Sequence, residues 1–417
     1  MQEEETTAPA PSITFESFNF EPELKEGLES MGFKKPTPIQ QQAIPIILKE
    51  HDLIACAQTG TGKTAAFLLP IINKLTRDKI HTTDTLIIVP TRELAIQIDE
   101  AVQGFAYFCH TSAIAIFGGS DGISFAQEKR ALSEGANIII ATPGRLIAHL
   151  NMGYVNFNHI KHLILDEADR MLDMGFSDDL NKIISFLPKE RQTLLFSATM
   201  PPKIRELAKR ILKEPEQINI SVSKPAAGVL QGAYVLYDNQ KIELLKRLLT
   251  DRKMASIIVF CSRKENVKQL DRELKRMKFN VACIHSDLEQ EERTEVLRNF
   301  KNKTLQILVA TDVMSRGIDI DSIGLVVNYD VPNDAEDYVH RVGRTARAET
   351  TGVALTFITP ENQFKFGRIE ELIETEVKKL QLPAELGPGP EYNPKKRIGK
   401  PQGNRSGKGG GFKKRRK

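Results

Sequence analysis

LIACAQTGTGKT, residues 53–64, is the stretch that decides the fold. The apolar run Leu53–Ala57 predicts a buried strand, and a helical pattern, Ala65–Leu69, follows the glycine-rich segment. A strand, a glycine-rich loop and a helix in this order are the setting in which proteins hold phosphate. Glycines let the backbone approach the phosphates, and the N–H groups at the helix start point at the negative charge. The stretch therefore predicts an α/β fold with a nucleotide site.

Two side chains of this loop carry the expected chemistry. Lys63 should reach the β- and γ-phosphates, and the Thr64 hydroxyl should ligate Mg²⁺. Ala57 stands where the strict pattern G-x-x-x-x-G-K-[ST] has glycine, so a chance glycine-rich turn stays open for this segment alone. The residues expected to contact the nucleotide are Ala57, Gln58, Thr59, Gly60, Thr61, Gly62, Lys63 and Thr64.

About a hundred residues later, acidic residues follow a second apolar run. Asp166-Glu167-Ala168-Asp169 stands at the carboxyl end of the strand predicted at His162–Leu165, where ligands of open α/β sheets collect. Asp166 can hold Mg²⁺, mostly through water, and Glu167 can orient and deprotonate an attacking water. The alternative is an acidic helix N-terminus. The phosphate loop favours the catalytic interpretation.

Apolar runs alternate with helical patterns such as Lys203–Leu212 and Glu265–Met277, which predicts doubly wound α/β domains with parallel sheets. The other strands of the first series are predicted at Thr85–Val89, Ile138–Ala141 and Thr193–Phe196; those of the second at Ser256–Cys261, Val281–Ile284, Gln306–Ala310, Gly324–Asn328 and Ala354–Ile358. Ser, Pro, Ala and Gly cluster between the series. The predicted division is a disordered segment 1–14, a domain 15–220, a linker 221–232, a domain 233–375 and an extension 376–417.

Charge is distributed unevenly. Residues 395–417 contain eleven Lys or Arg and no Asp or Glu, and removing those charges from the net charge of +4 leaves −7 for residues 1–394. The glycine-rich basic tail cannot bury a core, so we expect it to be disordered and to bind nucleic-acid phosphates non-specifically. A solvated solubility tail is the alternative.

No apolar run is long enough for a membrane span, and the acidic N-terminus does not resemble a secretory signal. Four scattered cysteines, Cys56, Cys109, Cys261 and Cys283, show neither metal-ligand nor redox spacing. We expect reduced thiols and a cytoplasmic protein without membrane partners.

Asp166–Asp169 spells DEAD, and with the phosphate loop the chain resembles the DEAD-box RNA helicase family of superfamily 2 over residues 15–370. The short basic tail is similar to that of the bacterial RhlE type. The resemblance implies two tandem RecA-like domains that bind ATP, Mg²⁺, and single-stranded and duplex RNA. It also implies a monomer with ribonucleoprotein or ribosomal partners.

Ahead of the phosphate loop, GFKKPTPIQ at 32–40 resembles the family's adenine-recognition motif. The Gln40 amide both donates and accepts, which matches the N6 and N7 edge of adenine and favours ATP over GTP. Phe33 belongs to this motif, and Phe15 stands 17 residues before Gly32, where the family has an aromatic that stacks on the base. A core phenylalanine is the alternative for Phe15.

The family's RNA-contacting motifs of the first domain match segments just after predicted strands, where hydroxyls and N–H groups suit phosphate oxygens. The residues are Pro90, Thr91, Arg92, Gly119, Thr142, Pro143, Gly144 and Arg145. Ser197-Ala198-Thr199 resembles the motif that couples hydrolysis to strand separation, with Asp169 and His340 as the other coupling residues.

In the second domain, Gln290 and Arg293 resemble the Q-x-x-R pair, and Thr311 would touch an RNA phosphate. Gly317 and Asp319 would face the ATP ribose. Arg344 and Arg347 match the arginine fingers and lie one helical turn apart. Ala346 and Met314-Ser315 depart from the usual family residues, but remove no ligand-bearing side chain.

The resemblance implies a split site in which ATP hydrolysis needs both domains. Lys63, Thr64, Asp166 and Glu167 would act from one domain, and the arginine fingers from the other. RNA would favour closure, and closure would unwind duplexes locally and non-processively. The alternatives are an ATP-dependent RNA clamp with little turnover, a DNA helicase or translocase, and a kinase.

Overall fold

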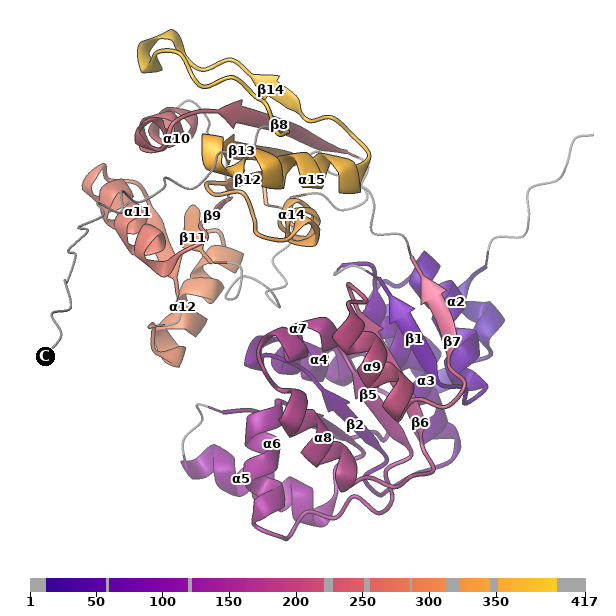
Figure 1. Ribbon diagram of the computed structural model, residues 1–417. Helices are drawn as coiled ribbons and strands as arrows, with labels where there is room; N and C mark the ends of the chain where they lie inside the picture. The colour runs from indigo at the N-terminus through magenta and orange to yellow at the C-terminus, as the bar shows by residue number, and fades with distance from the viewer. Residues whose placement is uncertain are drawn as a thin grey trace, which may run out of the picture.

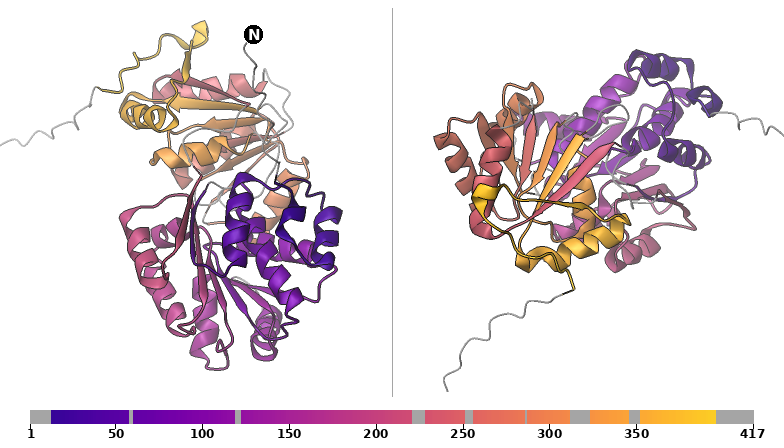
Figure 2. Two further views of the ribbon diagram at one scale, coloured as in Figure 1. Left: turned by 90° about the vertical axis from the view of Figure 1, so that its right-hand side faces the viewer. Right: turned by 90° about the horizontal axis from the view of Figure 1, so that it is seen from above.

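The computed structural model describes residues 13–57, 60–118, 122–220, 228–250, 256–285, 287–311, 323–345 and 352–395. These form two lobes, each built on a seven-stranded sheet with helices on both faces (Figure 1). The two further views in Figure 2 show the same two lobes from the side and from above. The expected α/β architecture of two tandem domains with parallel sheets is confirmed.

The first sheet has the order β3-β4-β2-β5-β6-β1-β7, and all neighbouring pairs are parallel. Its strands are β1 (Leu53–Cys56), β2 (Thr85–Ile88), β3 (Ala113–Ile116), β4 (Ile138–Ala141), β5 (His162–Leu165), β6 (Gln192–Ser197) and β7 (Glu216–Asn219).

Two apolar cores lie on the two faces of this sheet, and successive strand residues alternate between them. Leu53 and Ala55 enter the core under α1–α4, while Ile54 enters the core under α6–α9. The helices are η1 (Phe15–Phe18), α1 (Pro22–Ser30), α2 (Pro38–Leu48), α3 (Lys63–Arg77), α4 (Arg92–Phe105), α5 (Gly122–Glu134), α6 (Pro143–Asn151), α7 (Ala168–Asp173), α8 (Ser177–Ser185) and α9 (Pro202–Ile211).

The second sheet has the order β10-β11-β9-β12-β13-β8-β14, again parallel throughout. Its strands are β8 (Val229–Val235), β9 (Ile257–Phe260), β10 (Val281–Ile284), β11 (Ile307–Ala310), β12 (Leu325–Asn328), β13 (Gly352–Ile358) and β14 (Lys378–Leu380). Helices α10 and α11 cover one face, and α12, α14 and α15 the other. The helices are η2 (Asp238–Gln240), α10 (Lys241–Thr250), α11 (Lys264–Arg276), α12 (Gln290–Lys301), α14 (Ala335–Val342), η3 (Pro360–Asn362), α15 (Gln363–Ile373) and η4 (Ala384–Leu386).

All ten predicted strands are present, within two residues of the predicted ends. The four strands that the sequence did not predict are β3, β7, β8 and β14, all at or next to a sheet edge. β7 (EQIN) and β14 (KKL) carry polar or charged residues, and β8 contains Gln231 and Gly232, all of which weaken the apolar signal. β3 (AIAI) is apolar throughout but only partly buried, and its sequence gives no reason why it was not predicted.

The predicted linker 221–232 extends too far toward the C-terminus, because β8 begins at Val229 and residues 229–232 therefore belong to a strand. Gly232, which suggested a linker, lies inside this strand, where a Cβ would come within 2.9 Å of the Leu380 side chain. The glycine therefore allows close packing rather than a flexible connection.

The predicted boundary at 375 also differs. β14 pairs with β8 and belongs to the second sheet. Further along, the Tyr392 hydroxyl donates to Glu370 Oε2 at 2.5 Å, and Gln363 bonds the backbone at residues 391 and 393. The extension is thus packed onto the second domain as far as residue 395. Of the segment 1–14 that was expected to be disordered, residues 1–12 lie outside those described, as does the tail from 396, whereas the Thr14 carbonyl oxygen accepts from the Ser17 N–H at 3.2 Å at the start of η1.

Within the described part of the chain, no helix has the length and apolar character needed to cross a bilayer.

Candidate functional site

The glycine-rich loop connects β1 to α3. Lys63, the first residue of α3, is buried, and its Nζ donates to the Ala57 carbonyl oxygen at 2.9 Å. Gly60 and Gly62 have φ angles of 81° and 93°, a region that side chains rarely adopt. At Gly60 and Gly62 the backbone therefore has the conformation expected of a phosphate cradle. The Lys63 ammonium group is held on a neutral oxygen that a phosphate could replace.

Gln40 lies against this loop. Its Oε1 accepts from the Thr37 backbone N–H at 2.9 Å, and its Nε2 donates to the Gly62 carbonyl oxygen at 3.1 Å. A Cβ on Gly62 would come within 2.5 Å of Gln40 Nε2. The residue expected to read the adenine is thus in direct contact with the residue that shapes the phosphate loop.

Asp166 and Glu167 follow β5 at the carboxyl edge of the sheet. The Asp166 side chain is buried, and this burial raises its pKa to about 6, against the opposing effect of the Lys63 ammonium. Glu167 has a positive φ of 51°, and its N–H donates to Asp166 Oδ1 at 2.9 Å. A positive φ in a residue with a side chain is a strained conformation that occurs often at functional sites.

Glu167 forms an ion pair with Arg170, a residue that the sequence analysis did not predict for the site. Arg170 Nη1 lies 3.2 Å from Glu167 Oε2, and both side chains are nearly buried. The two residues are one helical turn apart, so helical periodicity alone could have indicated the pair.

Asp169 links this segment to Ser197-Ala198-Thr199. Its Oδ2 accepts from both the N–H and the hydroxyl of Thr199, each at 2.9 Å. The Ser197 hydroxyl accepts from the Asp169 N–H at 3.3 Å and donates to the Thr199 carbonyl oxygen at 2.8 Å. The three predicted coupling residues of the first domain therefore form one hydrogen-bonded unit.

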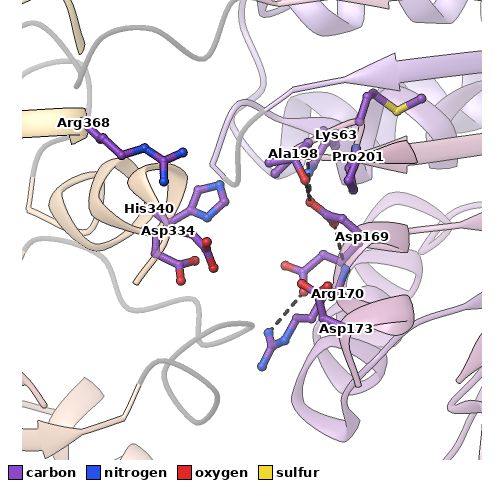
Figure 3. A pocket seen from close by; sticks show the side chains of 13 residues that line it. Lys63, Asp169, Arg170, Asp173, Ala198, Pro201, Asp334, His340 and Arg368 are labelled. Carbon is purple, nitrogen blue, oxygen red and sulfur yellow. Dashed lines mark hydrogen bonds and ion pairs between the residues drawn. The ribbon is translucent and has the colours of Figure 1, made fainter. Parts of the chain in front are cut away.

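A cleft of about 490 Å³ lies between the two lobes (Figure 3). The first lobe contributes Lys63, Glu167, Asp169 and Thr199, and the second contributes His340, all of which the sequence predicted. The lining residues that it did not predict are Arg170, Asp173, Asp334, Asp337 and Arg368, together with Met200 and Pro201 beyond the Ser-Ala-Thr segment.

Arg368 shows why some of these residues were missed. It lies on α15, which packs on α14 through the rings of Tyr338 and Phe366, whose centroids are 5.9 Å apart. Only this packing brings Arg368 near His340, since no local motif connects them.

The segments expected to contact RNA follow neighbouring strands of each sheet. In the first sheet they come after β2, β3 and β4, whereas the nucleotide segments come after β1, β5 and β6. In the second sheet Arg293 and Thr311 come after β10 and β11, which stand in the places of β3 and β4. In the first sheet the strand order therefore puts the two kinds of segment on opposite halves of the carboxyl edge.

The comparison with known proteins decides what this arrangement is. The DEAD/DEAH box helicase profile matches residues 37–207, and the helicase conserved C-terminal domain profile matches residues 240–349. The ATP-dependent RNA helicase CshA of Listeria monocytogenes is 42% identical over 370 residues, covering 88% of this chain and 70% of that protein.

The chain belongs to the DEAD-box helicase family.

Other relatives agree with this assignment. The CshA helicase of Geobacillus kaustophilus is 41% identical, covering 89% of this chain and 79% of that protein. Among solved structures, S. cerevisiae Dbp5 bound to RNA and ADP BeF3 is 31% identical with a TM-score of 0.78, covering 89% and 96% of the two chains. Mss116p bound to single-stranded RNA and AMP-PNP is 30% identical with a TM-score of 0.79, covering 91% and 82%. The chain is thus an ATP-dependent RNA helicase of this family.

The Listeria and Geobacillus relatives are CshA helicases. They support the family, and they do not bear out the narrower likeness to the RhlE type.

Two of the helicase's expected RNA-contacting side chains have partners within the protein. The Thr91 hydroxyl accepts from the Leu94 N–H at 3.3 Å and caps α4. Arg145 Nε lies 2.7 Å from Glu128 Oε2, and its guanidinium group lies over the Phe125 ring at 4.7 Å. By contrast, a Cβ on Gly144 would meet no heavy atom within 4 Å, so the backbone there is open.

Arg92 and Glu93 begin α4. The Arg92 guanidinium group lies over the Phe117 ring at 4.5 Å, and Pro90, two residues after β2, is buried. Glu93 Oε1 lies 3.9 Å from Nη1 of Arg293 on the other lobe. The expected RNA-contacting segments of the two domains therefore meet in the helicase at this pair.

Phe15 is 7% exposed and packs edge-on against Phe18 and Phe33, with centroids 6.2 and 6.1 Å apart. Its position is that of a core residue beside the adenine motif, so its stacking on a base stays a prediction.

Arg344 follows α14 and is half-buried, but it is not among the residues that line the cleft. The predicted residues Gln58, Thr59, Gly119, Gly317, Asp319 and Arg347 lie outside the described residues, as does the side chain of Gln290.

Proposed function

We propose that this helicase couples RNA-stimulated ATP hydrolysis in the interdomain cleft to local, non-processive unwinding of RNA duplexes. The observation that supports this most is the cleft itself, where Glu167 and the Asp169–Thr199 unit of one domain face His340 of the other. A site divided between two domains can act fully only when they close.

In the proposed mechanism Lys63 exchanges its Ala57 carbonyl for phosphate oxygens. Glu167 orients the attacking water and accepts its proton. Arg344 and Arg347 approach the γ-phosphate on closure and stabilise charge in the transition state, a contribution on the order of 10³–10⁵ in rate. RNA bound across both domains favours closure because it binds the closed form better.

The residues present fit Mg²⁺. Mg²⁺ uses few protein ligands and keeps several waters, and it supplies charge neutralisation at the phosphates. In the described part of the chain no three His, Cys, Asp or Glu side chains gather into a metal cage. The buried Asp166 carboxylate beside Lys63 and the half-buried Thr64 suit this minimal coordination.

The proposal extends to nucleotide choice, substrate and location. Gln40 selects ATP by giving up its bond to the Gly62 carbonyl for the adenine edge. RNA is preferred over DNA through 2′-OH contacts. No disulfide joins any of the four cysteines, all of which lie in the described residues, and this fits a reducing cytoplasm. A likeness to the RhlE type, ribonucleoprotein or ribosomal partners, and monomeric action are further parts of this proposal.

Steady-state ATP hydrolysis with single-stranded RNA, DNA of the same sequence, or no nucleic acid tests the proposal. We expect strong stimulation by RNA, and a loss of about 10²–10⁴-fold in the Glu167→Gln variant. Glu206→Gln, an exposed glutamate on α9, is the matched control. RNA binding without turnover would instead indicate an ATP-dependent clamp, and stimulation by DNA alone would contradict the RNA assignment.

A further inference from the structure

The two sheets of the helicase repeat one topology. Counted along the chain within each domain, the strands of both sheets stand in the order 3-4-2-5-6-1-7. β8 is therefore the counterpart of β1, and β12 the counterpart of β5. The helix after β1 begins at Lys63 and the helix after β8 begins at Lys241, while Asp166 follows β5 and Asp330 follows β12. The lysine and the aspartate of the nucleotide site thus have counterparts in the second domain.

A cavity of about 910 Å³ lies at this counterpart position. Its walls come from the segments after β8, β9, β12 and β13, the carboxyl edge where open α/β sheets bind ligands. The lining residues that matter here are Asp238, Lys241, Ser262, Asn266 and Asp330.

The cavity is not built for phosphate. Lys241 is 4% exposed, and its Nζ lies 2.9 Å from Asp330 Oδ1 and 2.8 Å from Asp238 Oδ1. Two carboxylates therefore neutralise the ammonium group, whereas Lys63 is held by a neutral carbonyl oxygen. The segment between β8 and α10, LYDNQ at 236–240, also contains no glycine that could cradle an anion.

Instead, Asp330 joins several segments of the domain. Its Oδ2 accepts from the Ser262 N–H at 2.9 Å and from Asn266 Nδ2 at 3.4 Å, at the start of α11. Its carbonyl oxygen accepts from Arg341 Nη1 at 2.8 Å. Helices α10, α11 and α14 are thereby fixed to the end of one strand.

Arg341 fixes α14 from inside. It is 2% exposed, also donates to Asn328 Oδ1 at 3.1 Å, and lies over the Phe260 ring at 5.1 Å. The next residue toward the N-terminus, His340, lines the nucleotide cleft. Because a buried guanidinium group is strongly destabilising without its acceptors, α14 cannot turn unless these bonds are replaced.

We propose that the second domain uses the counterpart of the nucleotide site as an internal brace, in which Lys241, Asp330 and Arg341 hold the cleft-facing side of α14 in the position that hydrolysis requires. These are positioning residues and touch no substrate. The inference rests on the proposed participation of α14 in RNA-stimulated hydrolysis.

The test uses the full-length protein and two independent changes: Lys241→Met, and Asn328→Leu, which removes an acceptor of Arg341. RNA-stimulated kcat should fall about 10- to 100-fold, because small displacements of catalytic groups have effects of this size. KM for ATP and RNA affinity should be unchanged, and Lys241→Arg should restore part of the rate. Lys246→Met is the matched control, on the same helix and the same cavity rim but paired with the exposed Glu243 at 2.6 Å.

The thermal unfolding temperature of each variant shows whether a lower kcat comes from a displaced α14 or from a general loss of stability. Unchanged kcat in a variant that is folded at the assay temperature would overturn the proposal, and so would a rise in KM for ATP, since Lys241 would then act as a ligand. If Lys241→Met does not fold, Asn328→Leu decides between these outcomes. A wild-type protein without RNA stimulation would refute the proposed function itself, whereas an active wild type with unaffected variants would refute only the brace.

Discussion

Asp169 Oδ2 accepts two hydrogen bonds from Thr199, one from its N–H and one from its hydroxyl, each at 2.9 Å. Asp169 lies two residues after Glu167, the proposed hydrolytic carboxylate. It is thus bound to Thr199, in the segment that follows β6. A shift of either segment is transmitted to the other, because hydrogen bonds to a charged acceptor contribute about 1.5–3 kcal/mol.

Replacing Thr199 by Val should impair unwinding more than hydrolysis. The backbone bond to Asp169 remains, so Asp169 keeps one donor, but the hydroxyl that stiffens the link is lost. We expect more ATP to be hydrolysed for each duplex separated, measured by parallel ATPase and strand-displacement assays. Thr76→Val is the control, because its hydroxyl donates to the Ile72 carbonyl oxygen of α3 and Thr76 does not line the cleft. An unchanged ratio would show that the Thr199 hydroxyl has no coupling role.

Replacing Gly62 by Ala should weaken ATP binding through the contact with Gln40. The φ of 93° costs about 1–3 kcal/mol for a residue with a side chain, and the new Cβ would lie 2.5 Å from Gln40 Nε2. Gly153→Ala separates the two effects, since Gly153 has a φ of 77° but nothing within 4 Å of a Cβ. KM for ATP should rise in Gly62→Ala alone; an equal rise in both variants would contradict the role of the contact.

The Lys241–Asp330 pair should stabilise the second domain over a wide pH range. Burial acts to raise the pKa of Asp330, but Lys241 and the donors around it outweigh burial and lower it. The stabilisation is therefore present above the unfolded pKa of about 4 and is lost as pH falls through the lower folded value. Burial acts to lower the pKa of Lys241, but Asp330 and Asp238 outweigh burial and raise it. The stabilisation by the pair is therefore lost at high pH only above the unfolded pKa of about 10.4.

Asp330→Asn should accordingly lower the free energy of unfolding by about 3 kcal/mol, measured by urea denaturation. The difference from the wild type should stay constant between pH 5 and pH 9. A difference that halves between pH 7 and pH 5 would show that the folded pKa of Asp330 is raised rather than lowered.

Cys283 should react slowly with alkylating reagents. Burial, followed by the nearby Asp271 carboxylate, raises the pKa of its thiol to about 11. Since an unperturbed cysteine has a pKa of about 8.5, the thiolate fraction near neutral pH should be lower by about two orders of magnitude. The rate of modification by iodoacetamide, followed by peptide mass spectrometry, should rise tenfold per pH unit up to pH 10. A plateau near pH 9 would contradict the raised value.

Deleting residues 395–417 should reduce RNA affinity and its salt dependence. The segment carries eleven Lys or Arg, and each phosphate contact with a single strand contributes about −0.7 to the slope of log K against log salt. Titrations at several salt concentrations should give a shallower slope, with unchanged KM for ATP. An identical slope would favour a solubility tail.

The sequence alone determined ten of the fourteen strands that the structure describes, the phosphate loop and the acidic segment after β5. Central strands of parallel sheets are buried on both faces, so their apolar runs are continuous and easy to read. Phosphate loops need glycine, lysine and threonine in a short contiguous stretch, so Gly60–Thr64 is visible in the chain itself. The edge strands β7 and β14 and the neighbouring strand β8 were missed because polar residues or glycine interrupt their apolar runs, whereas the edge strand β3 was missed although its sequence is apolar.

Tertiary structure alone decided which distant side chains meet. Arg368 reaches the cleft through the packing of α15 on α14, Glu93 meets Arg293 across the two domains, and Asp330 joins Lys241 to Arg341 from opposite faces of a sheet. None of these pairs is close in sequence or belongs to a local pattern. Their proximity follows from strand order and helix packing, which depend on burial summed over a whole domain and not on any short segment.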